Sequence, residues 1–110
     1  MKAALYCCFP CEEFDCPDIL EQELILVNLM QHVDGELYAI YVDKGLEAAL
    51  TPRASFLQMV QDGKTHLFDV LLCIHPRMLE AYADLELASL ITIFPSEPVT
   101  HSAPSHTIKL

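Results

Sequence analysis

Residues 1–14 read MKAALYCCFPCEEF, and this stretch holds the clearest indication of the fold. Its first part, Lys2–Cys8, is a continuous apolar run, which is typical of a strand buried on both faces of a parallel sheet. The run ends before Pro10, and a short acidic turn follows. We therefore expect a central strand that opens the chain and leads directly into a loop.

The remainder of the chain alternates between helix and strand patterns. The expected strands are Lys2–Cys8, Glu36–Val42, Phe68–Ile74 and Leu87–Phe94; the expected helices are Ile19–Val33, a segment from Thr51 to about Gly63 and a short segment after Pro76. Asp18 is a suitable N-cap for the first helix, with Glu21 three residues later as in a capping box. Such alternation predicts an α/β domain over residues 1–94, with helices on both faces of a mostly parallel four-stranded sheet. Residues 95–110 are expected to form an extended Pro-rich tail.

In parallel sheets, ligands bind beyond the carboxyl ends of the strands, where the strand order reverses. Three predicted loops meet at that edge: Phe9–Cys11, Lys44–Pro52 and His75–Arg77. We expect any functional site of this chain to lie there.

Composition restricts the classes of partner. The chain has 110 residues, enough for one domain, and 53% of them are hydrophobic, which excludes a disordered chain. No apolar run approaches the length of a membrane span, and the N-terminus lacks the order of regions of a signal peptide, so a cytoplasmic protein is expected. Six Lys and Arg against sixteen Asp and Glu give a net charge of −10, with no basic cluster. Because nucleic-acid affinity comes largely from neutralised phosphates, we expect weak or no DNA binding by this chain alone.

The first strand and its loop resemble the opening of the serine recombinases, the resolvase/invertase family, where a strand ends in Tyr-x-Arg-x-Ser. Tyr6 matches this pattern, but Cys8 stands in place of the arginine and Pro10 in place of the nucleophilic serine. The resemblance continues at the start of the first helix, where Gln22 fits the family's Ser-Leu-x-x-Gln pattern. Asp43 fits the Asp-x-Gly that closes its second strand.

The later matches are partial. Arg53 stands where the family has an arginine before its second helix, and Arg77 fits the first arginine of an Asp-Arg-Leu-x-Arg motif. Pro76 replaces the aspartate of that motif and Glu80 its second arginine. The resemblance covers roughly residues 1–94. The long dimerisation helix and the DNA-binding domain of the family have no counterpart in this sequence.

Taken together, these matches imply a resolvase-like domain with a degenerate site. Strand cleavage in the family needs a serine that links covalently to DNA phosphate and a cluster of arginines around it. Proline has no side-chain oxygen, so Pro10 cannot form that link. The resemblance therefore implies a non-catalytic remnant or an accessory module in a mobile-element context, with no cofactor, whereas Arg53 and Arg77 are equally well explained as surface or helix-end residues.

Two other classes of function remain open. Cys8 and Cys11 have the spacing of half a zinc site, which Cys16 or His75 would complete, so a small metal- or thiol-dependent protein is one alternative. Against it, neighbouring residues Cys7 and Cys8 point to opposite faces of a strand, and free cysteines are common in protein cores.

A domain that binds protein is the other alternative. The first helix carries two apolar faces, one with Leu20, Leu24 and Val27 and the other with Ile19, Leu26, Leu29 and Met30. Only one can pack on the sheet. An apolar face left open indicates a protein contact, so we expect a homo-oligomer or a larger partner at this helix.

Overall fold

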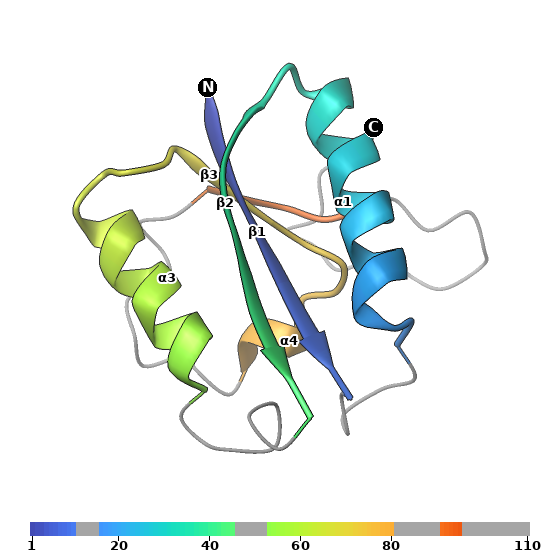
Figure 1. Ribbon diagram of the computed structural model, residues 1–110. Helices are drawn as coiled ribbons and strands as arrows, with labels where there is room; N and C mark the ends of the chain where they lie inside the picture. Colours follow the sequence, from blue (N-terminus) through green and yellow to red (C-terminus); the bar gives the residue numbers. More distant parts are fainter. Residues whose placement is uncertain (11–15, 46–52, 81–90, 96–110) are drawn as a thin grey trace.

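The computed structural model describes residues 1–10, 16–45, 53–80 and 91–95. These residues form an α/β domain around a four-stranded sheet in the order β2-β1-β3-β4, with every neighbouring pair parallel. The strands are β1 (Lys2–Phe9), β2 (Glu36–Lys44), β3 (Val70–Cys73) and β4 (Ile91–Ile93). Two longer helices, α1 (Ile19–His32) and α3 (Ala54–Lys64), flank the sheet on opposite sides, and α4 (Arg77–Glu80) is a single turn (Figure 1). The predicted three-layer α/β fold is confirmed.

Strand β1 lies in the interior of the sheet because both of its faces are apolar. Its residues 3–8 are completely buried. Ala4, Tyr6 and Cys8 join the core on the α3 side, while the alternate residues Leu5 and Cys7 join the core on the α1 side. This strict alternation places β1 between two cores, as its continuous apolar run predicts.

Helix α1 begins as expected, with the Asp18 side chain accepting a hydrogen bond from the backbone N–H of Glu21 at 2.9 Å. Of its two apolar faces, the one with Leu26, Leu29 and Met30 packs on the sheet. On the other face Leu20 and Leu24 remain 66% and 65% exposed. The helix therefore retains an open apolar surface among the described residues.

The start of α3 differs from its prediction. The Thr51-Pro52 pattern suggested that the helix begins there, but these two residues lie outside the described part of the chain, and α3 starts at Ala54 with Arg53 at its N-cap. Gly63, expected to end the helix, lies within its last turn and is buried. The N-terminus of α3 is instead capped by the side chain of Asp43, which belongs to β2.

The other boundaries differ by small amounts. Strand β2 runs on to Lys44, and β3 is confined to Val70–Cys73. The predicted strand residues 87–90 and the predicted tail from residue 96 onward lie outside the described residues. Within the part of the chain that is described, no helix has the length and hydropathy needed to cross a membrane.

Candidate functional site

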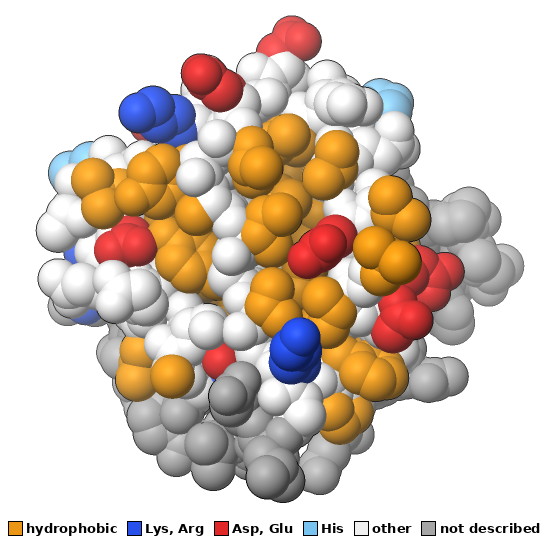
Figure 2. Space-filling model, in the orientation of Figure 1, with side chains coloured by type: hydrophobic (Ala, Val, Ile, Leu, Met, Phe, Trp, Pro, Cys, Tyr) orange, Lys and Arg blue, Asp and Glu red, His pale blue; other side chains and the backbone are white. Residues whose placement is uncertain are grey.

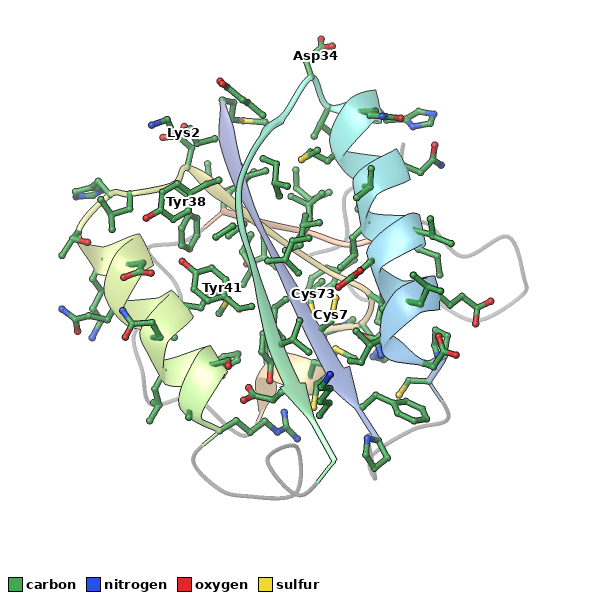
Figure 3. All side chains as sticks on the ribbon, viewed as in Figure 1. Lys2, Cys7, Asp34, Tyr38, Tyr41 and Cys73 are labelled. Carbon is green, nitrogen blue, oxygen red and sulfur yellow. The ribbon has the colours of Figure 1, made fainter. Side chains whose placement is uncertain are left out.

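Five of the sequence-predicted site residues converge at the carboxyl ends of β1 and β2. Tyr6 and Cys8 come from β1, Asp43 from β2, Gln22 from α1 and Arg53 from the turn before α3. All five are buried. The lower half of the view in Figure 3 shows this end of the sheet, with Cys7 and Cys73 labelled close to it.

Tyr6 and Asp43 form the centre of this cluster. The Tyr6 hydroxyl donates a hydrogen bond of 2.8 Å to Oδ2 of Asp43, and both side chains are at most 1% exposed. The two strands bring them together because Cys8 stands opposite Asp43 in the register, and Tyr6 lies two residues earlier on the same face. Burial is the main reason that the pKa of Tyr6 lies far above its ordinary value, and the nearby Cys8 and Asp43 raise it further. The phenol therefore stays protonated and acts as a donor.

Asp43 also caps helix α3. Its Oδ1 accepts a hydrogen bond from the backbone N–H of Ser55 at 3.0 Å, and its Oδ2 accepts one from the N–H of Phe56 at 3.1 Å. These are the second and third residues of the helix, which an N-cap side chain normally satisfies. Arg53, at the N-cap position, makes no such bond. A carboxylate at a helix N-terminus is also stabilised by the helix dipole.

Gln22 extends the hydrogen bonding of β1 beyond the end of β3. Pairing between β1 and β3 ends at Tyr6, opposite Cys73. Two residues further on, the Gln22 side chain accepts a hydrogen bond from the Cys8 N–H at 3.1 Å and donates to the Cys8 carbonyl at 2.8 Å. It also donates to the Pro17 carbonyl at 2.7 Å. The Gln22 side-chain amide thus makes the two hydrogen bonds that a neighbouring strand would make with Cys8, and it holds α1 against the sheet.

Arg53 is buried, whereas the sequence left open that it is a surface residue. It is 7% exposed, and its Nη1 donates to the Met78 carbonyl at 3.4 Å, which links the start of α3 to α4. Arg77 and Glu80 lie in α4, but their side chains fall outside the described part of the structure. The structure therefore brings Arg53 into the cluster and does not test the roles of the other two.

Pro10, at the position of the family's nucleophile, is exposed at the end of β1. It borders a shallow surface groove whose described lining is Phe9, Pro10, Asp18, Ile19, Leu20, Lys44 and Gly45. Within this lining no residue carries a hydroxyl or a thiol, and the Asp18 carboxylate is bound to the N-terminus of α1. The described lining of the groove therefore contains no hydroxyl or thiol that could attack a phosphate.

The cysteines behave mainly as core residues. Cys7 and Cys8 lie on opposite faces of β1, as expected. Cys16 lies near the Cys8 carbonyl, with its Sγ 3.8 Å from that oxygen, and Cys11 is outside the described residues. No group of three or more His, Cys, Asp or Glu suited to a metal ion occurs among the residues described. Because Cys11 lies outside the described residues, the structure does not test a metal centre at Cys8, Cys11 and Cys16.

Sequence reasoning missed two members of this region, Cys73 and Met78. The Cys73 Sγ lies 3.3 Å from the Met78 Sδ, and both side chains are fully buried. Cys73 ends the third strand, so the rule that sites gather at the carboxyl ends of strands was the available indication. The position of Met78 beside Cys73 depends on tertiary packing alone.

We expect the buried thiol of Cys73 to make stability fall at alkaline pH. Burial raises the pKa of this thiol to about 12 from an ordinary value of 9.0. The pKa of this thiol is higher in the folded protein than in the unfolded chain. Its contribution to the free energy of unfolding is therefore complete below pH 9 and is lost as the pH rises toward 12. The loss amounts to about 1.4 kcal/mol per pH unit for one proton. Urea unfolding between pH 8 and 11 should show a shallower decline for Cys73→Ala than for the unaltered protein; equal slopes would contradict the prediction.

Comparison with known proteins adds no further constraint. A scan against protein-family models and searches of curated proteins and of solved structures each found no match to the chain. The functional conclusion therefore rests on the residues and their geometry.

Proposed function

We propose that this chain is a non-catalytic, protein-binding domain with the architecture of the serine recombinase catalytic domain. The observation that carries the proposal is the use of Tyr6, Gln22 and Asp43. Each of these family-like polar side chains is buried and bonded to another part of the fold. A catalytic constellation requires groups free to meet a substrate in the reacting geometry. Here they connect β1, β2, α1 and α3 to one another.

The chemistry of the groove supports the same conclusion. Family catalysis needs an activated hydroxyl beside positive charge, because a phosphoryl transition state develops negative charge on its oxygens. Pro10 supplies no nucleophile. Among the described residues of the groove lining, Lys44 carries the positive charge, while Arg53 is buried outside that lining and donates to the Met78 carbonyl in α4. The net charge of −10 also opposes the approach of a phosphate backbone.

Protein binding is supported by the outer face of α1. Leu20 and Leu24 stand one helical turn apart, and both are about two-thirds exposed. Leu20 also lines the shallow groove with Phe9 and Pro10, so the apolar surface continues from the helix onto the end of β1. Contiguous exposed apolar surface of this kind is typical of a protein contact.

The test of the proposal is incubation with supercoiled and with linear duplex DNA. We expect neither nicking nor a covalent protein–DNA adduct on a denaturing gel, and binding no tighter than about 10⁻⁴–10⁻⁶ M at physiological salt. Cys8→Arg/Pro10→Ser, which restores two of the family's residues, serves as the comparison. An adduct formed by the unaltered protein, or submicromolar affinity for random duplex, would overturn the proposal.

A further inference from the structure

Strand β2 forms one edge of the sheet. Within the described residues it pairs with β1 on one side and with no strand on the other. In Figure 1 it faces the viewer between α3 and α1, and in Figure 2 hydrophobic side chains gather on both sides of its position. A long edge strand of this kind presents a row of backbone donors and acceptors to any strand that approaches.

The backbone hydrogen bonds at the two ends of β2 show which of its residues point outward. The N–H of Glu36 donates to the Met1 carbonyl at 2.8 Å, and the N–H of Gly45 donates to the Phe9 carbonyl at 3.0 Å. Alternate residues between them face β1, apart from a register shift between Leu37 and Ala39. The N–H and C=O groups of Leu37, Ile40 and Val42 therefore point to the open edge.

The exposed apolar side chains of β2 lie on both faces of the sheet. Leu37 and Ile40, 46% and 37% exposed, are on the α1 side. Tyr38, 38% exposed, is on the α3 side, where its ring centroid lies 6.2 Å from that of Phe68. A partner that packed on one face would cover only half of them. A strand added in the plane of the sheet covers both sets.

We propose that a second copy of this chain adds to that edge, with its β2 antiparallel to the first and the two-fold axis at Ile40. Two four-stranded sheets would then join into one of eight strands. The proposal rests on the protein-binding function proposed above and names its partner. Symmetric dimers are the commonest closed assembly, and strand addition supplies main-chain hydrogen bonds as well as apolar contact.

This register satisfies both the hydrogen bonds and the side chains. Ile40 pairs with Ile40 of the second copy. Tyr38 is the extra residue at the register shift of β2, so Leu37 stands opposite Val42 of the second copy. All are outward-pointing residues, and such opposed pairs exchange two backbone hydrogen bonds. On the other face Tyr41 stands opposite Ala39. Each of these cross-strand pairs is apolar, and such pairs contribute roughly 0.2–1 kcal/mol.

The charges at the ends of the strand are complementary in this arrangement. Asp34 precedes β2 and Glu36 is its first residue, whereas Lys44 is its last. Figure 3 shows Asp34 at the upper end, far from the carboxyl end of the strand. Antiparallel pairing brings the acidic end of one copy beside the basic end of the other, while parallel pairing would bring like charges together.

The experiment measures molar mass by light scattering and sedimentation at about 1–100 µM. We expect the unaltered chain to be a dimer that dissociates within or below this range. Ile40→Lys and Ile40→Glu each place two like charges opposite each other at the axis, and each should weaken the dimer by about 100-fold. An equimolar mixture of the two variants should recover a dimer, because opposite charges then meet. Ile91→Lys, the same change at exposed Ile91 of the other outer strand β4, is the matched control and should leave the dimer intact.

Two results would overturn this inference. One is a monomeric unaltered chain over the whole range. The other is an assembly that survives Ile40→Lys and is lost in Leu24→Lys; in that case protein binding through α1 stands and the edge is the wrong surface. A covalent DNA adduct would instead remove the proposed function and leave the dimer measurement unaffected, so the two failures are distinguishable.

Discussion

Replacing Asp43 with alanine is expected to lower the free energy of unfolding by about 3–5 kcal/mol. The carboxylate accepts three hydrogen bonds, from the Tyr6 hydroxyl and from the N–H groups of Ser55 and Phe56. Its loss leaves a buried phenol without its acceptor and removes the cap of α3. Urea or thermal unfolding followed by circular dichroism measures the change.

Asp62 provides a matched control for this substitution. Its carboxylate also accepts a tyrosine hydroxyl, from Tyr41 at 2.6 Å, and the Gln58 side chain at 2.8 Å, but it is only half-buried. Asp62→Ala should therefore cost about 1 kcal/mol. If Asp43→Ala destabilised the protein no more than Asp62→Ala, the structural role assigned to Asp43 would be wrong.

The second large effect is expected at Gln22. Substitution by methionine keeps the length and the apolar volume of the side chain but removes its hydrogen bonds to the N–H and C=O of Cys8 and to the C=O of Pro17. Buried backbone groups without hydrogen bonds are costly, and we expect a loss of about 2–4 kcal/mol. Gln31→Met, at an exposed position of the same helix, should be close to neutral. A Gln22→Met protein as stable as the unaltered chain would contradict this account of how α1 is held to the sheet.

The layers of the fold could be predicted from the sequence because their patterns are local. The apolar run of β1 indicated burial on both faces, and Asp18 and Glu21 marked the start of α1. The two apolar faces of α1 were also visible. The face that packs on the sheet is the one that carries Gln22. A polar residue is not expected in a core, and Gln22 is buried there because its side chain is hydrogen-bonded to the backbone of β1.

The start of α3 could not be predicted in the same way. Thr51 and Pro52 are a familiar local signal for the beginning of a helix, but the cap that satisfies the helix comes from Asp43, on another element. Its partner Tyr6 is 37 residues away in sequence. Contacts of this kind depend on strand order and register, which composition and periodicity do not contain. For the same reason the position of β2 at the edge of the sheet emerges only from the structure.

The rule that sites lie at the carboxyl ends of parallel strands predicted the place where Tyr6, Cys8 and Asp43 come together. The rule could not say whether the polar side chains there are free or bonded to the fold. Proteins commonly sacrifice stability at catalytic sites, so replacing a catalytic residue often leaves stability unchanged or raises it. A residue that holds the fold together has the opposite signature.

A double-mutant cycle of Tyr6→Phe and Asp43→Asn tests this distinction most directly. The free energy of unfolding is measured by urea denaturation for the unaltered protein, the two single variants and the double variant. We predict that both single variants are destabilised and that the coupling between the two side chains is about 1.5–3 kcal/mol, as for a buried hydrogen bond to a charged group. Single variants as stable as the unaltered protein or more so, with no coupling between them, would contradict the structural role of this cluster and point back to a functional site.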